Sequence, residues 1–337
     1  MKAFSAKLGI AAAVLGLALH AGPAAAEVRE VKIAQQFGIS YLPLMYLEHQ
    51  KLLEKHAKAM GAGDVTVSWA KFAGGNVMNE ALLSGSLHFA SGGVGPLVNL
   101  WAKTKGNLDV KAVCAMNAMP LYLNTRNPDV KSIRDFTGKD KIALPAVKVS
   151  IQAVTLQMAA AKEFGEDKFD ALDKFTVSMK HPDGMAALLS DASEITAHFT
   201  SPPFQYQELE DPKVRTLLSS FDVLGGPATF NVIWTTSKFR DENPKVYAAF
   251  LKAFDEAIDT INKDKSAAAD NYIKWSGYKG SKDLIMKILN DPKVSFTMTP
   301  NNTTKYSDFL HKIGTIKVKP DSWKDMFFPE VHDLKGS

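Results

Sequence analysis

Hydroxyl, amide and glycine residues recur where strand-like runs of this sequence give way to helical ones. Thr200 and Ser201 end the run EITAHFT, and Ser40 with Tyr41 follows the run VKIAQQFGI. A helix that begins at such a junction presents free backbone N–H groups and the positive end of its dipole to a ligand. These residue types therefore indicate reversible binding of a small polar or anionic solute. The other junctions of this kind are Gly74 to Asn76, Ser91 to Gly93, and Ser150.

A purely structural role competes with this interpretation at every junction. Ser, Thr, Asn and Gly also serve as helix caps and turn residues, whatever the function of the protein. Each residue taken alone fits a cap better than a ligand contact. Only helices that converge on one cleft from two domains would form a cage of donors. Lys148, in the run PAVKVS, is the candidate countercharge for an anionic solute.

Motifs of catalysis are absent from the sequence. It contains no G-x-S-x-G elbow, no H-E-x-x-H pair, no phosphate-binding P-loop and no G-x-G-x-x-G fingerprint. His181, Asp183 and His198 could be drawn together as a metal site, but a lone histidine at a strand end commonly caps or packs. We therefore expect a protein that is not an enzyme and that holds neither a metal nor a cofactor.

Composition and charge exclude several other classes of protein. The 337 residues suffice for about two domains, and 46% hydrophobic with 23% charged residues is ordinary for a globular protein. The 40 Lys and Arg residues are spread among 36 Asp and Glu residues, which argues against nucleic-acid and membrane surfaces as partners. Cys114 is the single cysteine, so no intramolecular disulfide can form.

The first 26 residues have the pattern of a secretory signal peptide. Lys2 and Lys7 precede an apolar run over 8–19, and the triplet Ala24 to Ala26 supplies the small residues of a cleavage site. An uncleaved anchor is the alternative, but the run is shorter than the roughly 20 residues that span a bilayer. We expect cleavage after Ala26 and a periplasmic mature protein. Loss of the two lysines would leave it a net charge near +2.

Short apolar runs alternate with helical stretches from residue 31 onward, as in a mostly parallel α/β sheet. The first predicted unit has strands at 31–37, 64–72, 87–91 and 110–116 and helices at 40–60, 77–84 and 96–105. The second has strands at 141–145, 175–181 and 194–200 and helices at 150–165, 183–190 and 202–210. The chain ends with a strand at 228–239 and amphipathic helices at 243–262, 266–277 and 283–290.

Several segments together resemble the nitrate, sulfonate and taurine family of substrate-binding proteins of ABC importers, which includes relatives that bind thiamine-precursor pyrimidines. They are the exported start, AQQFGISYLPLMYLEHQKLLEKHA, KFAGGNVMNEALLSGSLHFASGG, ALPAVKVSIQAVTLQMA and EITAHFTSPPFQYQ. The resemblance covers about residues 28–330 and implies a type II periplasmic binding protein, with two α/β lobes joined by a two-strand hinge. The first lobe would comprise residues 27–118 and 228–337, and the second residues 119–227. The hinge strands would lie near 116–123 and 225–231.

The resemblance also implies a function and a site. The expected protein is the extracytoplasmic solute-binding component of an ABC importer, a monomer that passes a sulfonate-, nitrate- or taurine-like solute to a membrane permease and its ATPase. A pyrimidine thiamine precursor is the alternative ligand, because PAVKVSIQ departs from the glycine-serine start of many anion-binding members. A ligand-sensing subunit is the alternative role. The residues assigned to the solute are Gln36, Phe37, Ser40, Tyr41, Gly75, Asn76, Ser91, Gly92, Ser150, Thr200 and Ser201.

An enzyme of the same fold is the remaining alternative. The pyrimidine synthases that share this fold resemble one another in a cysteine-rich CCCFC motif, which Cys114 alone cannot supply. An export signal also separates this chain from those cytosolic enzymes. We therefore expect binding rather than catalysis.

Overall fold

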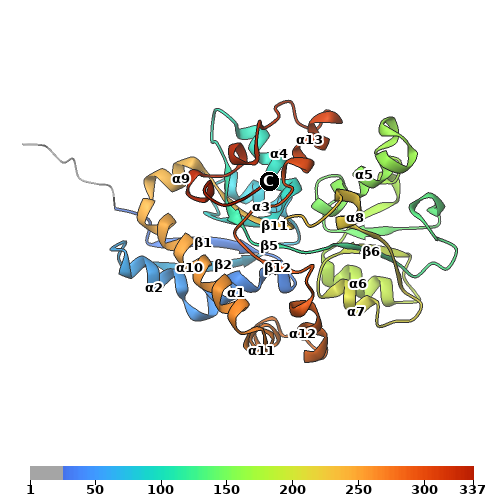
Figure 1. The fold of residues 1–337 in the computed structure, drawn as a ribbon, viewed down its shortest axis with the longest axis horizontal. Helices are drawn as coiled ribbons and strands as arrows, with labels where there is room; N and C mark the ends of the chain where they lie inside the picture. Colours follow the sequence, from blue (N-terminus) through green and yellow to red (C-terminus); the bar gives the residue numbers. More distant parts are fainter. Residues whose placement is uncertain (1–25) are drawn as a thin grey trace, which may run out of the picture.

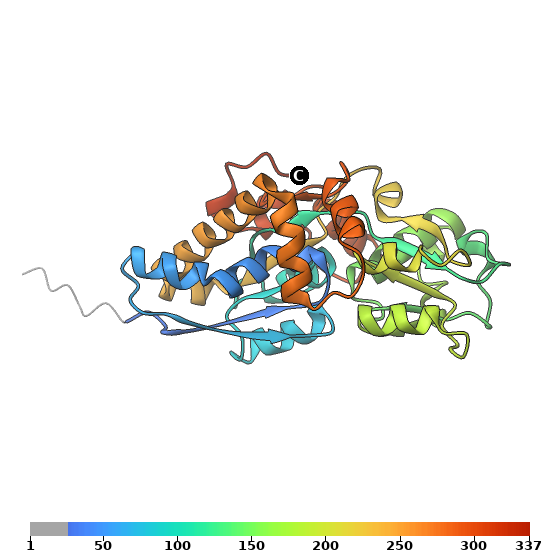
Figure 2. The same cartoon turned by 90° about the horizontal axis from the view of Figure 1, so that it is seen from below.

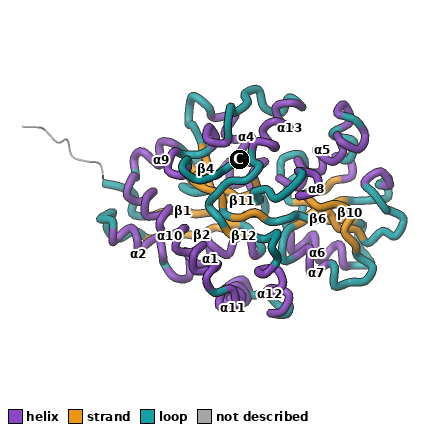
Figure 3. The backbone as a smooth tube through the Cα atoms, in the orientation of Figure 1, coloured by secondary structure: helices purple, strands orange, loops and turns teal. Residues whose placement is uncertain are grey.

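The computed structural model describes residues 26–337, which form two α/β lobes side by side (Figure 1). Apart from Ala26, the predicted signal peptide lies outside the described residues. The early and late parts of the chain, blue to cyan and orange to red in Figure 1, build one lobe, and the middle of the chain, in green and yellow, builds the other. Strands form the centre of each lobe, with helices around them (Figure 3). The predicted fold class is confirmed.

The first lobe contains a two-stranded sheet, β2-β1, and a three-stranded sheet, β3-β11-β4, which lie next to each other in that order. Strands β1 and β2 pair in parallel, and a bridge between Ile33 and Phe89 joins β1 to the start of β3. Strand β11 runs antiparallel between β3 and β4, so the returning chain supplies a central strand. The strands are β1 (Glu30–Gln35), β2 (Thr66–Lys71), β3 (Ala90–Gly93), β4 (Lys111–Ala115) and β11 (Asn231–Thr235).

The second lobe contains a five-stranded sheet in the order β10-β6-β9-β7-β8. Strand β7 pairs in parallel with β8 and β9, whereas β6 pairs antiparallel with β9 and β10. Strand β9 is fully buried, including its polar residues His198 and Thr200, because it lies between β6 and β7 in the middle of the sheet. The strands are β6 (Tyr122–Thr125), β7 (Ile142–Leu144), β8 (Thr176–Ser178), β9 (Ala197–Thr200) and β10 (Arg215–Ser219).

Helices cover both faces of the first-lobe sheet (Figure 2). The longest, α10, begins at Pro244 and buries an apolar stripe that includes Val246, Phe250, Phe254 and Ile258. This spacing of three to four residues gives the helix one apolar face, which packs against α1 and α2. The helices are η1 (Ile39–Tyr41), α1 (Leu42–Gln50), α2 (Leu52–Ala59), α3 (Gly75–Leu83), α4 (Val94–Thr104), α9 (Ser237–Glu242), α10 (Pro244–Lys263), α11 (Lys265–Ser276), α12 (Lys282–Asn290), α13 (Thr304–Lys312), η5 (Trp323–Met326) and η6 (Pro329–Val331).

The helices of the second lobe include α5, which lies against the first lobe. Its N-cap is Ser150, whose Oγ accepts a hydrogen bond from the Ala153 N–H at 3.2 Å. Helix α5 packs on α4 and α13 of the first lobe and on α8 of its own lobe. The helices are η2 (Ile133–Asp135), α5 (Ile151–Phe164), η3 (Glu166–Lys168), η4 (Asp173–Phe175), α6 (His181–Leu189), α7 (Phe204–Glu208) and α8 (Ser220–Leu224).

The chain crosses between the lobes after β4 and again before β11. Short strand β5 (Asn117–Ala118) lies on the first crossing, and a bridge between Ala118 and Thr229 pairs it with the second. Strand β12 (Ser295–Phe296) pairs with the other side of β5. We propose lobe boundaries at residues 118 and 227, because the strands on either side of these points belong to different sheets.

Some predicted elements differ from the structure at their ends. The predicted helix over 40–60 is two helices, because Lys51 adopts a left-handed conformation with φ of 51° between α1 and α2. The predicted strand over 228–239 is limited to β11, since the Thr236 hydroxyl accepts from the Phe239 N–H and begins α9. Helix α13 was not predicted. Local capping chemistry therefore sets boundaries that the apolar pattern alone leaves too wide.

Candidate functional site

The strand ends of the two lobes meet along a line of contacts that we call the seam. The Ile39 N–H donates to the Pro202 carbonyl at 3.3 Å, which joins η1 to the segment after β9. Gly93, just before α4, lies against Ile151 at the start of α5. A Cβ on this glycine would come within 2.5 Å of the Ile151 Cγ2. The two lobes are therefore closed on each other. The strand ends that the sequence predicted as binding positions lie on the two sides of the seam.

Four predicted residues lie buried on the first-lobe side of the seam: Gln36, Ser40, Tyr41 and Ser91. The Gln36 side-chain amide donates to the Ser91 carbonyl at 3.3 Å, and the Ser91 hydroxyl donates to the Ala34 carbonyl at 2.5 Å. These contacts tie the end of β1, and the residue after it, to β3. Ser40 Oγ differs, because it is buried and has no hydrogen-bond partner in the described part of the chain.

Two asparagines complete this side, Asn117 on the first crossing and Asn231 at the start of β11, and the sequence prediction missed both. The Asn231 side-chain amide donates to the Tyr41 hydroxyl at 2.9 Å, and that of Asn117 donates to the Ser40 carbonyl at 2.8 Å. Asn231 Oδ1 is buried without a hydrogen-bond partner among residues 26–337. Burial raises the pKa of Tyr41 far above its ordinary value, although the hydrogen bonds from Asn231 and Gln36 oppose this. The phenol is thus neutral near pH 7.

The second-lobe side of the seam holds three predicted residues with different roles. The Ser150 hydroxyl is used as the cap of α5, which is the structural role weighed above. Thr200 Oγ1 lies 2.8 Å from His181 Nδ1 and is fully buried. Ser201 Oγ is also fully buried and has no hydrogen-bond partner within the described residues. Ser201 therefore differs from Ser150 and Thr200, whose hydroxyls each have a partner.

The predicted glycines make room for side chains of their own lobe. A Cβ on Gly75 would come within 2.9 Å of the Pro96 Cβ, and one on Gly92 within 2.9 Å of the Gln36 amide nitrogen and 3.2 Å of the Trp234 ring. Neither glycine has a positive φ angle. Close packing, rather than a left-handed backbone, therefore requires glycine at these two positions.

The last two predicted residues lie toward the edge of the seam. Phe37 is partly buried, and Lys180 of the second lobe places its Nζ 6.0 Å from the centre of the Phe37 ring. Lys180 also pairs with Asp183 at 3.4 Å. Asn76 lines a cavity of about 300 Å³ between α3 and α4, which reaches Val149 of the second lobe. Asn76 thus faces an outer groove rather than the strand ends.

The seam carries little positive charge. No Lys or Arg side chain among residues 26–337 is buried. Lys148, the predicted countercharge, is exposed. Its charge acts on Asp173, where burial raises the pKa of the carboxyl and Lys148 opposes this rise. The groups that the seam offers are hydroxyls, amides and one imidazole.

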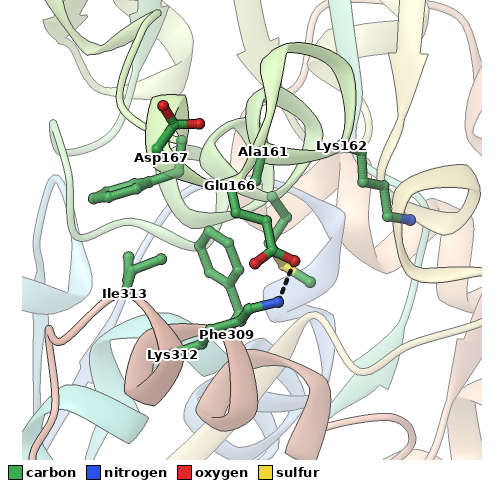
Figure 4. Close-up of a pocket in the computed structure, with 9 residues that line it drawn as sticks. Ala161, Lys162, Glu166, Asp167, Phe309, Lys312 and Ile313 are labelled. Atoms are coloured by element: carbon green, nitrogen blue, oxygen red, sulfur yellow. Dashed lines mark hydrogen bonds and ion pairs between the residues drawn. The ribbon is translucent and has the colours of Figure 1, made fainter.

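Another cavity, of about 590 Å³, lies away from the strand ends, between α5, the turn after it and α13 (Figure 4). Glu166 and Lys312 form an ion pair across it, and the Phe169 and Phe309 rings meet edge to face with centroids 6.4 Å apart. Each pair joins the second lobe to α13. None of the predicted site residues lines this cavity.

Two further findings bear on the class of site. In the part of the chain that the structure describes, no group of three or more His, Cys, Asp and Glu side chains could hold a metal ion. Among the described helices, none is both long enough and apolar enough to cross a membrane. The arrangement suits hydrogen bonding to a small polar molecule enclosed by two lobes.

Two α/β lobes that close at their strand ends and are joined by crossing strands define the type II periplasmic binding protein fold. The chain belongs to the NMT1-like family, whose model matches residues 24–276. No curated protein sequence matches the chain. The predicted resemblance to the nitrate, sulfonate and taurine group of binding proteins is confirmed by this family and by the solved structures that follow.

Three solved structures illustrate the similarity. The alkanesulfonate-binding protein SsuA from Xanthomonas axonopodis pv. citri, bound to MOPS, is 17% identical with a TM-score of 0.66, over 86% of this chain and 94% of that one. The aliphatic sulphonate binding protein SsuA from Escherichia coli is 19% identical with a TM-score of 0.63, over 90% and 92%. The nitrate-binding protein NrtA from Synechocystis PCC 6803 is 14% identical with a TM-score of 0.66, over 88% and 84%. At these identities the likeness establishes the fold.

Proposed function

We propose that this chain is the periplasmic solute-binding component of an ABC importer, and that it captures a small polar solute at the seam. The carrying observation is that Ser40 Oγ and Ser201 Oγ, on opposite lobes, are both buried without partners among the described residues. A buried hydroxyl without a hydrogen bond costs about 1–3 kcal/mol. Unpartnered hydroxyls on both sides of a closed seam therefore favour a ligand that bridges the lobes.

Bridging gives the binding protein its mechanism. A ligand shifts an equilibrium only through contacts that differ between the two states. A solute that touches Ser40 and Asn231 on one side and Ser201 on the other makes all of its contacts only when the lobes close. The closed, loaded form then docks to a membrane permease, whose ATPase drives uptake. The names of the solved relatives, which bind sulfonates and nitrate, support this role.

The charge of the solute is the open part of the proposal. A sulfonate, nitrate or taurine-like anion would be held by N–H groups at helix starts and by hydroxyls, where a charge-assisted hydrogen bond contributes about 1.5–3 kcal/mol. Three or four such bonds approach the 8 kcal/mol or so of a micromolar complex. A neutral pyrimidine is the second candidate, favoured because no Lys or Arg among residues 26–337 is buried.

Native mass spectrometry of residues 27–337, purified without unfolding, tests the proposal. A single stoichiometric compound, identified after denaturation, would support a solute-binding protein and give the charge class of its ligand. A protein that purifies empty is then titrated calorimetrically with MOPS, nitrate and a hydroxymethylpyrimidine. Failure of all three to bind, together with no compaction in small-angle scattering, would count against the proposed role.

A further inference from the structure

Three titratable side chains, which we call the histidine cluster, lie buried in the second lobe. They are His181 at the start of α6, His198 on β9 and Glu208 at the end of α7. The two imidazole centroids are 5.7 Å apart, and His198 Nδ1 lies 2.5 Å from Glu208 Oε1. Buried titratable groups are rare unless they are paired. Because Glu208 pairs with His198, His181 is left to make its contacts elsewhere.

His181 connects the cluster to the seam. Its Nδ1 lies 2.8 Å from Thr200 Oγ1, and its Nε2 lies 3.5 Å from the side-chain nitrogen of Gln152. The ring stacks on Phe204, with centroids 5.7 Å apart and planes at 21°. A Cβ on Gly38 of the first lobe would come within 3.4 Å of the Phe204 ring. One aromatic ring thus separates His181 from the opposite lobe.

These contacts favour one of the two positions for the proton on the His181 ring. Burial, with a smaller effect of the neighbouring His198, holds the pKa of His181 well below its ordinary value, so the ring is neutral near pH 7. A neutral imidazole has one N–H donor and one bare nitrogen. The nearest group to Nε2 is the Gln152 amide nitrogen, a donor 3.5 Å away, which favours the tautomer with Nε2 bare and the proton on Nδ1. The Nδ1–H then donates to Thr200 Oγ1, and the Thr200 hydroxyl proton is directed elsewhere.

We propose that His181 is a positioning residue, which fixes the Thr200 hydroxyl as a hydrogen-bond donor toward the solute. This inference deepens the proposed function and rests on it. A second proton on His181 would set a new Nε2–H against the Gln152 N–H, so two donors would face each other. The loaded, closed form therefore requires the neutral ring.

Linkage gives the direction of the pH effect. Opening exposes Phe204 and the ring behind it, so the open form takes up a proton more readily than the closed form. Solute affinity is then unaffected above the ordinary histidine pKa of 6.5 and falls as pH drops below it. The other titratable and charged groups near the ring are paired with each other. His198 on β9 pairs with Glu208 on α7, and Lys180 pairs with Asp183 at the start of α6. These pairs leave the direction of the pH effect on affinity unchanged.

Nitrogen-15 NMR of the histidine-labelled protein tests the tautomer without any solute. We expect a protonated Nδ1 and a bare Nε2 for His181 at pH 7, with the signals assigned by their loss in His181→Phe. A ring that is charged at pH 7, or protonated on Nε2, would overturn the inference. This result is readable even if the solute proposal fails.

Calorimetry with MOPS, nitrate and 4-amino-5-hydroxymethyl-2-methylpyrimidine tests the consequence. His181→Phe and Thr200→Val should each lower the affinity for the probe that binds roughly tenfold, and His181→Phe keeps the stack on Phe204. The double variant should bind no more weakly than either single variant. His181→Asn should restore much of the affinity at pH 7 and abolish its fall toward pH 5. Additive losses, or native affinity in His181→Phe, would contradict the proposal.

A matched control is His88→Asn. His88 is also a partly buried histidine whose pKa burial lowers, but it lies in the first lobe, where its Nδ1 accepts from the Lys32 N–H. Its replacement should leave the pH profile of binding unchanged. If His88→Asn also abolished the fall in solute affinity toward pH 5, the titrating group would lie outside the seam and the proposal would fail.

Discussion

The two lobes present contrasting faces to the seam. The first-lobe face consists of amides and hydroxyls that hydrogen-bond to each other and to backbone, as Gln36 does to Ser91 and Asn231 to Tyr41. Its phenol stays protonated because burial raises the pKa of Tyr41. The second-lobe face is backed by the histidine cluster, in which imidazole and carboxyl groups are enclosed. One face is chemically constant, whereas the other can change with pH.

This difference assigns separate tasks to the lobes. A face without groups that titrate near neutral pH can act as a fixed template for the polar atoms of a solute. A face backed by the buried His181 ring couples closure to proton release, because burial disfavours the charged ring. The predictions that follow test the contrast in order of the effect we expect.

The largest effect should come from His198→Leu, which leaves Glu208 fully buried without its imidazole partner, so that the Asn124 amide is the side chain still bonded to it. Breaking a buried pair from one side costs about 3–5 kcal/mol of unfolding free energy. Urea denaturation measures this loss. The control is His56→Leu, because His56 and Glu256 lie 2.6 Å apart in a pair whose carboxyl side chain is 35% exposed. That change should cost less than about 1 kcal/mol, and equal losses would remove the contrast between a buried and an exposed pair.

Gly93→Ala should obstruct closure of the lobes. The new Cβ would meet Ile151 of the other lobe at 2.5 Å, while the φ angle of −65° at Gly93 accepts alanine. Overpacking costs about 1–3 kcal/mol, so solute affinity should fall roughly ten- to a hundredfold. Gly138→Ala is the control, since a Cβ there meets nothing within 4 Å. A melting temperature lowered in proportion to the affinity would mean that Gly93 serves folding rather than closure.

Solute affinity should depend on pH through His181. Since the pKa of the ring is lower in the closed form, the native protein should lose affinity below pH 6.5, by at most about tenfold per pH unit. Titration calorimetry between pH 7.5 and 5 at constant ionic strength measures it, with any titration of the solute itself subtracted. An affinity that rises as the pH falls would reverse the sign and refute the closed-form assignment.

Tyr41→Phe should have the smallest effect. It removes the acceptor of the Asn231 amide, at a cost near 1 kcal/mol in stability. If the phenol also contacts solute, affinity should fall by a further few-fold. Tyr306→Phe is the control, because that phenol is equally buried and contacts Thr155 at 3.4 Å across α5 and α13. A larger affinity loss in the control would place the binding contacts elsewhere.

Much of the fold follows from local sequence. The alternation of apolar runs with amphipathic stretches predicts the α/β class, because strand and helix periodicities are local properties. The family resemblance, which depends on those same segments, is confirmed. The pattern alone could not place the tail: strand β11 enters the first-lobe sheet through pairing with β3 and β4, far earlier in the chain. Pairing partners at such separation leave no periodic trace in the sequence.

The candidate site also contains some residues that the sequence predicts and others that only the structure reveals. The junction residues were visible because helix caps and strand ends have local signatures. Asn117 and Asn231 were not, since each lies within a buried segment whose neighbours are apolar. From the sequence, His181 and His198 could be connected only with Asp183, as a possible metal site that their strand-end positions disfavour. The assignment of any of these residues to a solute is still a prediction.

The sequence by itself determined which elements form and which polar side chains stand at their ends. Ser150 illustrates this, because its partner, the Ala153 N–H, lies three residues away. Only the tertiary structure decided which hydroxyls have partners and which do not. Thr200 meets His181 across 19 residues, whereas Ser40 and Ser201 are buried with none among the described residues. A cap is fixed by local backbone geometry, but a hydrogen-bond partner across the fold depends on how the sheets and lobes pack.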